Sequence, residues 1–215
     1  MNPIIITNEC RYTNEHIYKD LCDMNILEES NKIHNKIPII TSANVCKSWL
    51  EKYMYKNNLN YSTFNVCVIG EKGLKYNINS INSPYLQISN KYSSREFSKN
   101  ILIVGSLFNY TINHKNILKE WLSKSDTMVI KTCDDLADPS GNCILPSYIL
   151  NQFNKVADVN VGKPDKNYAI EIYKTLKQNN LSTISPNEIL LIGDTMYTDI
   201  KMGKELGFKT MLVLT

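Results

Sequence analysis

Two aspartates follow an apolar, strand-like run near the end of the chain. The run ends in Gly193, Asp194 comes next, and Asp199 follows in the stretch LIGDTMYTDI. A carboxylate at the tip of a buried strand can ligate a hard cation such as magnesium, or it can cap the following turn. Asp199 starts the next expected helix, where the helix dipole favours a negative charge with or without a metal. Taken together, the G-D-x-x-x-T-D spacing favours a metal site.

Two other polar positions have the chemistry to hold an anion. Lys163 lies in the turn VGKP, where Gly162 permits a tight bend. A lysine held in this turn can neutralise a phosphate or a nearby carboxylate, and a solvated surface lysine is the alternative. Thr7 ends the apolar run IIIT and precedes Asn8. Its hydroxyl and neighbouring backbone N–H groups can hold phosphate oxygens, or they can make only a local turn.

These positions require a scaffold, and the chain alternates short apolar runs with helical patterns. Strands are expected at 3–7, 36–42, 64–70, 100–106, 127–133, 159–164, 188–195 and 209–215. Helices are expected at 13–26, 43–54, 113–124, 148–156, 165–180 and 198–208. Thr13 and Asp165 are expected N-caps, and Gly207 is expected to end the last helix. On helix 165–180 the expected inward positions are Ala169, Tyr173 and Leu176.

The alternation predicts the α/β class, with parallel strands joined by right-handed crossovers. Ligands of such sheets bind beyond the carboxyl ends of the strands, where Thr7, Lys163 and Asp194 all lie. Residues 58–150 are richer in Asn, Ser and Tyr and have strands of their own. We therefore expect 1–45 and 157–215 to form one parallel sheet with flanking helices, and 58–150 to form an inserted unit.

Composition excludes several classes of protein. The formal net charge of +3 and the scattered basic residues give no reason to expect a nucleic-acid partner. The sequence has no long apolar stretch and no signal peptide, so we expect a cytoplasmic protein with no membrane partner. The six cysteines form no C-x-x-C pair and lie far in sequence from the three histidines, so no zinc site is expected.

The motifs, in their order, resemble the haloacid-dehalogenase (HAD) superfamily of phosphohydrolases, class IIA, which is related to nitrophenylphosphatases. IITNECRYTNEHIYKDL resembles the second motif and its following helix, and IPIITSANVCKSWLEK resembles the segment leading into the cap. FNVCVIGEKGLK resembles the start of the cap, and IKTCDD its T-N-P-D segment. VGKPDKNYAIEIYKTL resembles the third motif, and ILLIGDTMYTDIKMGKELGFKTMLVLT the fourth.

The resemblance implies a Rossmann-like core with a parallel sheet, an inserted α/β cap, and magnesium-dependent hydrolysis of a small phosphorylated metabolite. By this resemblance Asp194 ligates Mg²⁺, and Asp199 supports the site from the next helix. Lys163 steadies the nucleophile and the phosphate, while Thr7 and Asn8 bind the phosphoryl group. Such a site lowers the barrier by positioning and charge neutralisation. The cap is the surface through which any oligomer is expected to form.

The sequence departs from the family pattern at the first motif. The two aspartates of its D-x-D-G-type motif belong upstream of the Thr7 strand, and residues 1–6 contain neither Asp nor Glu. The glycine, strand and helix that usually follow LVLT are also not found, and Cys133 and Asp134 replace the usual Asn and Pro. The chain is therefore expected to be an incomplete phosphohydrolase without its Asp nucleophile and first core strand, or a noncatalytic phosphate- and metal-binding remnant. Asp134 and Asp135 are assigned to the cap and are not expected to replace the nucleophile.

Overall fold

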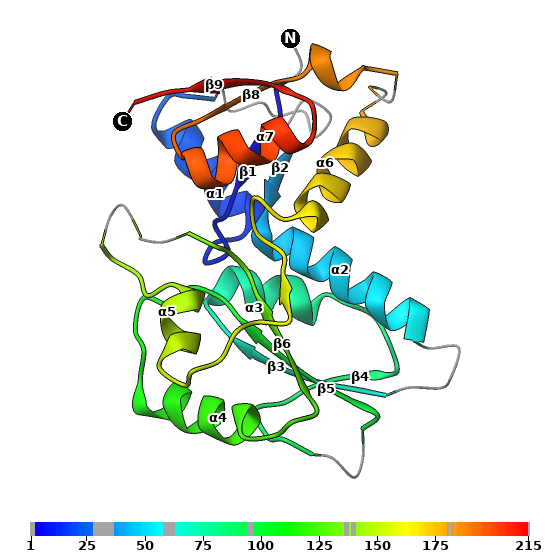
Figure 1. The fold of residues 1–215 in the computed structure, drawn as a ribbon, viewed down its shortest axis with the longest axis vertical. Helices are drawn as coiled ribbons and strands as arrows, with labels where there is room; N and C mark the ends of the chain where they lie inside the picture. The colour runs from blue at the N-terminus through cyan, green and yellow to red at the C-terminus, as the bar shows by residue number, and fades with distance from the viewer. Residues whose placement is uncertain are drawn as a thin grey trace.

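The protein is described by a computed structural model that covers residues 3–27, 37–57, 63–93, 97–135, 138, 141–179, 181 and 183–214. Its strands form three sheets, and every strand pair in them is parallel. This confirms the predicted α/β class. The N-terminal and C-terminal strands lie at one end of the molecule and the largest sheet lies at the other (Figure 1).

The two smaller sheets each contain one pair of strands. β1 (Ile5–Thr7) pairs with β2 (Ile39–Thr41), with Thr7 opposite Thr41. β8 (Leu190–Gly193) pairs with β9 (Lys209–Leu212), with Gly193 opposite Leu212. Helix α1 (Asn14–Asp23) joins the first pair, and a short π-helical turn, η4 (Met196–Ile200), and α7 (Lys201–Glu205) join the second.

The largest sheet has five strands in the order β4-β3-β5-β6-β7. Their bounds are Phe64–Ile69 for β3, Leu86–Ile88 for β4, Lys99–Val104 for β5, Thr127–Lys131 for β6 and Val159–Asn160 for β7. Side chains alternate between its faces, so Phe64, Val66 and Val68 join one apolar cluster while Cys67 and Ile69 join another. The second cluster packs under α4 (Ile112–Leu122) and α5 (Pro146–Asn151).

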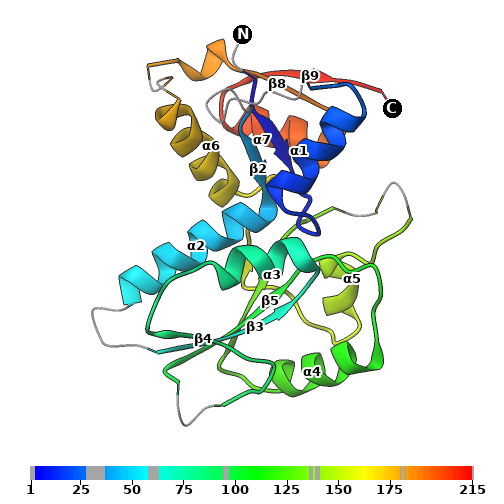
Figure 2. The ribbon, with the colours of Figure 1, turned by 180° about the vertical axis from the view of Figure 1, so that it is seen from behind.

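The first cluster is continuous from the five-stranded sheet to the small sheets. It includes residues of α2 (Ser42–Asn57), α3 (Lys72–Asn79) and α6 (Lys166–Gln178). In both views α2 lies between the two ends of the molecule (Figure 2). A single-turn 3-10 helix, η3 (Pro186–Glu188), precedes β8. This shared core fixes the small sheets against the five-stranded sheet, which is where the candidate site forms.

The two predicted N-caps and the glycine predicted to end the last helix agree with the structure. The Thr13 side chain accepts a hydrogen bond from the His16 N–H, and the Asp165 side chain accepts one from Asn167. Gly207 has a φ of +73°, as expected of a glycine that ends a helix. On α6, Ala169 and Leu176 are buried as predicted, but the Tyr173 prediction is wrong because its side chain is 41% exposed.

Two features of the sheets differ from the expectation. The strands in 1–45 and 157–215 do not form one sheet, because β1–β2 and β8–β9 are separate pairs. Thr7 makes its N–H hydrogen bond to a tyrosine hydroxyl of α6 rather than to a strand on the β8 side. The second difference is that β7, expected in the sheet of 1–45 and 157–215, pairs with β6 at the edge of the five-stranded sheet. The side chain of the preceding Asp158 accepts a hydrogen bond from the Val129 N–H of β6 at 2.7 Å.

The composition-based domain boundaries at residues 1, 58 and 215 lie outside the described residues. The strands from β3 to β7 form one sheet that contains neither β1 nor β8. Within the described part of the chain, none of the helices is long and apolar enough to cross a membrane.

Candidate active site

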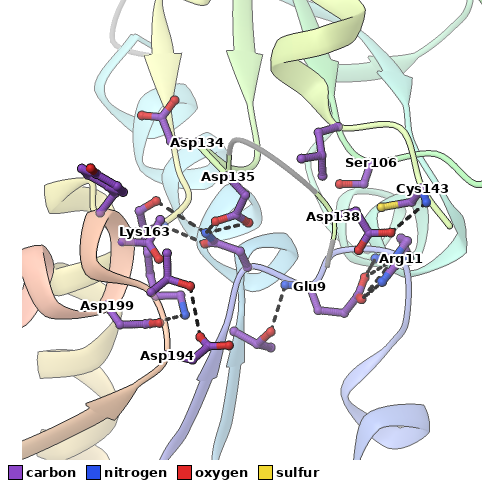
Figure 3. Close-up of a pocket in the computed structure, with 16 residues that line it drawn as sticks. Glu9, Arg11, Ser106, Asp134, Asp135, Asp138, Cys143, Lys163, Asp194 and Asp199 are labelled. Carbon is purple, nitrogen blue, oxygen red and sulfur yellow. Dashed lines mark hydrogen bonds and ion pairs between the residues drawn. The ribbon is translucent and has the colours of Figure 1, made fainter. Parts of the chain in front are cut away.

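Thr7, Lys163 and Asp194 line one pocket of about 360 Å³ (Figure 3). Thr7 is the last residue of β1, Asp194 follows β8 directly, and Lys163 lies just after β7. The three strands belong to three different sheets, yet their carboxyl ends meet at this pocket. Strand-end placement therefore brought together the residues that the sequence singled out.

Thr7 is held by its backbone, which leaves its side chain for the pocket. The buried Tyr168 hydroxyl accepts a hydrogen bond from the Thr7 N–H at 3.0 Å and lies 2.6 Å from the Thr7 carbonyl oxygen. Burial raises the pKa of Tyr168 well above its usual value, so this hydroxyl stays neutral and can serve both groups. The Thr7 Oγ1 accepts from the Glu9 N–H at 3.1 Å, so its own proton can be donated to a phosphate oxygen.

Lys163 and Asp199 form a buried ion pair. The Lys163 Nζ lies 2.6 Å from the Asp199 Oδ1, and the two residues are only 7% and 5% exposed. Gly193 makes room for Asp199, because a Cβ at Gly193 would lie 2.3 Å from the Asp199 Cβ. Asp199 therefore sits directly against β8 and holds the lysine at the pocket wall.

Asp194 is the exposed carboxylate of the same strand end. Its Oδ1 accepts a hydrogen bond from the Thr195 hydroxyl at 3.1 Å. Figure 3 places Asp194 on the same side of the pocket as the Lys163–Asp199 pair. An exposed carboxylate with hard oxygen atoms fits a magnesium ligand.

The donor set around Asp194 fits magnesium only with help from a substrate. Among the described residues, no group of three or more His, Cys, Asp and Glu side chains is arranged to hold a metal. Asp199 is already paired with Lys163. Magnesium is commonly held by one or two carboxylates together with substrate phosphate and water, so Asp194 suits an ion that arrives with a phosphate.

The side chain of Asn8, which was expected to bind the phosphoryl group, forms hydrogen bonds to other residues of the protein. Its Oδ1 accepts from the Lys163 N–H at 2.7 Å, and its Nδ2 donates to both Asp135 carboxylate oxygens at 3.0 and 3.1 Å. Its carbonyl oxygen accepts from the buried Ser42 hydroxyl at 2.7 Å. The structure thus places Asn8 among the lining residues, with its amide directed at neighbouring segments.

Asp134 and Asp135 also line the pocket, which the sequence reasoning missed. They follow β6 just as Asp194 follows β8, so the strand-end signal was present but was assigned to another unit. Burial raises the pKa of Asp135, and the hydrogen bond from Asn8 and the charge of Lys163 oppose that rise. Asp134 forms an ion pair with Lys131.

The far end of the pocket is formed by the loop after β1 and by residues beyond β5 and β6. Arg11 pairs with Glu9 at 2.6 Å, and its guanidinium carbon lies 4.8 Å from the Phe108 ring centroid. Ser106, Cys143 and Asp138 complete this end (Figure 3). These residues have no common spacing in the sequence, so periodicity could not reveal them.

Charge is unbalanced among the described residues that line the pocket. Six are acidic (Glu9, Asp134, Asp135, Asp138, Asp194 and Asp199), and only Arg11 and Lys163 are basic. Both basic groups are already paired with acids. A phosphate entering this pocket would meet net negative charge, so its binding is favoured by an added cation.

Parallel strands thus place a lysine, a threonine and an exposed aspartate at their carboxyl ends, around one pocket. Residues 160–215 match the family model described as "HAD-hyrolase-like". This segment contains Lys163, Asp194 and Asp199. No curated protein matches the chain.

Solved structures share the fold over almost the whole chain. A p-nitrophenyl phosphatase from Archaeoglobus fulgidus is 21% identical with a TM-score of 0.70, over 99% of this chain and 75% of that one. A 4-nitrophenylphosphatase from Thermotoga maritima is 18% identical with a TM-score of 0.72, over 99% and 72%. NagD from E. coli K-12 is 17% identical with a TM-score of 0.67, over 99% and 74%.

These findings confirm the resemblance to the haloacid-dehalogenase superfamily and to its nitrophenylphosphatase-like class. The family model covers the third- and fourth-motif region, and the fold extends the likeness through the five-stranded sheet. The chain therefore resembles these phosphatases in fold.

Proposed function

We propose that this chain belongs to a magnesium-dependent phosphohydrolase of the HAD type that acts on a small phosphate ester, and that the Asp nucleophile is not among these 215 residues. The observation that carries the proposal is the convergence of Thr7, Lys163 and Asp194 in one pocket. The nucleophilic aspartate of such an enzyme is not among the residues that precede Thr7 in this sequence. We therefore expect the 215 residues by themselves to bind phosphate without hydrolysing its esters.

Each residue has a specific part in this proposal. Mg²⁺, when bound, supplies positive charge to the phosphate oxygens. Asp194 and water would hold the ion, while the Thr7 hydroxyl donates to a phosphate oxygen. Lys163 neutralises phosphate charge, and Asp199 keeps its ammonium at the pocket wall.

The same proposal gives the two ends of the molecule different roles in binding the substrate. Residues 1–45 and 157–215 form the core that holds the phosphate, except that β7 pairs with the sheet of the cap. Residues 58–150 form the cap that contacts the rest of the substrate. Ser106, Asp134, Asp135, Asp138 and Cys143 bring cap residues to the pocket. The substrate is a small phosphorylated metabolite of the cytoplasm, no nucleic acid or membrane is involved, and any oligomer forms through the cap.

A second candidate function is a noncatalytic domain that binds phosphate and metal. It is favoured by the engagement of two acids of the pocket, because Asp199 pairs with Lys163 and Asp135 accepts from Asn8. Both carboxylates are thus already engaged within the protein, as expected of a site that binds its ligand without turnover.

An assay with nitrophenyl phosphate and Mg²⁺ tests the proposal. The chain should show no enzymatic turnover, and Asp194→Asn and Asp135→Asn should match it. Turnover that disappears in Asp194→Asn would refute the absence of a nucleophile, and its loss in Asp135→Asn as well would identify that nucleophile. An in-frame D-x-D-G-like stretch in the DNA before Met1 would favour the enzyme over the noncatalytic domain.

A further inference from the structure

The Asn8 side chain connects three segments that are distant in sequence. Its amide joins the end of β1 to Lys163, which follows β7, and to Asp135, which follows β6. The same amide nitrogen also lies 3.5 Å from the Lys163 carbonyl oxygen. One side chain thus contacts both the residue proposed to neutralise phosphate and an acid that follows β6.

The surroundings of Asn8 leave little freedom for this contact to form in another way. A Cβ at Gly162 would lie 2.3 Å from the Thr132 carbonyl oxygen and 3.0 Å from the Asn8 Oδ1. The Ser42 hydroxyl fixes the Asn8 main chain from α2. The backbone at Gly162, directly before Lys163, is therefore close to both Asn8 and the residues that follow β6.

We infer that Asn8 is a positioning residue, which sets where the Lys163 ammonium and the Asp135 carboxylate stand in the pocket. This inference rests on the proposed function, because it assigns Lys163 to the phosphate. Asn8 acts through the main chain of Lys163 and through Asp135, and it does not itself contact the substrate.

The chemistry of an amide explains why asparagine serves at this position. Its oxygen accepts from the Lys163 N–H while its nitrogen donates to a carboxylate. Aspartate would keep the acceptor but would place a second carboxylate at hydrogen-bond distance from Asp135, where like charges repel. The reciprocal exchange of the two residues would restore one donor and the same total charge.

The test measures acetylation of individual lysines by mass spectrometry in Asn8→Asp, in Asp135→Asn and in the double variant. Lys163 is buried and should react slowly in the wild type. Asn8→Asp should speed its acetylation by about tenfold or more, the equivalent of one charge-assisted hydrogen bond. The double variant should return close to the wild-type rate, and Asp135→Asn alone should stay near it because its amide oxygen still accepts from Asn8.

Asn100→Asp is the matched control. Asn100 is buried and donates to Asp126 at 3.2 Å, so the substitution makes the same kind of carboxylate pair in the five-stranded sheet away from the pocket. It should leave Lys163 acetylation unchanged. Equal acceleration in Asn8→Asp and Asn100→Asp, equal acceleration of every lysine, or no recovery in the double variant would overturn the inference.

Inorganic phosphate with Mg²⁺ separates this inference from the proposed function. Phosphate should protect Lys163 from acetylation in the wild type if the proposed function holds. Lack of protection would contradict that function, whereas the variant series without phosphate would still decide the role of Asn8.

Discussion

Among the described residues of the site, Lys163 and Asp199 form the most buried ion pair. Lys163→Met leaves the buried Asp199 without a partner, so we expect a loss of about 3–5 kcal/mol in the free energy of unfolding. The double variant Lys163→Met/Asp199→Asn should lose less, because no unpaired charge remains. Chemical denaturation measures both.

The more exposed pair of Lys131 and Asp134 provides the comparison. Lys131→Met should cost about 1 kcal/mol or less, as exposed ion pairs do. Equal losses in Lys163→Met and Lys131→Met would contradict the account of a buried, structurally required pair.

The raised pKa of Asp135 predicts a specific pH dependence of the free energy of unfolding. Burial raises its pKa in the folded protein, so the native state binds more protons than the unfolded state above an unfolded pKa of about 3.9. Its contribution to stability is therefore favourable at low pH and is lost as the pH rises through the native pKa. Denaturation of Asp135→Asn and wild type across this range should show the variant gaining relative stability as the pH increases. A constant difference between the two curves would contradict the assigned shift.

At the scale of elements, the approach of η4 to β8 depends on Gly193. Gly193→Ala would place a Cβ 2.3 Å from the Asp199 Cβ, so η4 must move and take Asp199 away from Lys163. We expect a loss of about 1–3 kcal/mol in the free energy of unfolding and faster acetylation of Lys163.

Gly207→Ala is the matched variant for that prediction. Gly207 has a positive φ but its nearest neighbour to a new Cβ is 3.7 Å away, so the cost is about 1 kcal/mol of backbone strain. Its Lys163 acetylation should equal that of the wild type, and an increase as large as in Gly193→Ala would contradict the specific role of Gly193.

Some elements were predictable from sequence, and others depend on distant contacts. Apolar runs and caps such as Thr13 and Asp165 locate most strands and helices, because those signals are local. Helix α3 escaped prediction because Gly73 is a poor helix former. In the structure Gly73 lies against the Tyr12 backbone, and its N–H donates to the Arg11 carbonyl oxygen at 2.7 Å.

The site, too, has residues that the sequence predicted and contacts that it could not predict. Thr7, Lys163 and Asp194 were predictable because each lies at or just beyond the end of an apolar strand. The Asn8–Asp135 contact spans 127 positions in the sequence, and neither periodicity nor spacing encodes it. The edge position of β7 was also missed, because a two-residue strand has no period to read.

At the scale of the whole molecule, the β8–β9 pair exposes apolar side chains. Leu190, Ile192, Met211 and Leu212 are 52%, 57%, 52% and 41% exposed. Neighbouring exposed apolar residues on paired strands favour association. We expect the purified 215-residue chain to associate non-specifically through this exposed sheet, separately from an oligomer formed through the cap. Ile192→Lys/Met211→Lys should shift it towards the monomer in light scattering.

Val156→Lys is the control for this prediction. Val156 is 84% exposed and lies outside the β8–β9 pair, so the new charge should leave the association unchanged. A similar shift towards monomer with Val156→Lys would assign the effect to net charge rather than to this sheet.

The central claim is that the pocket binds phosphate and magnesium together through Asp194 and Lys163. Calorimetric titration of inorganic phosphate into the chain, with and without Mg²⁺, tests it most directly. Because the lining residues are predominantly acidic, we expect phosphate to bind measurably only when Mg²⁺ is present. Asp194→Asn should abolish the effect of Mg²⁺. Phosphate binding that is equal with and without Mg²⁺, or that is unchanged in Asp194→Asn, would contradict the account.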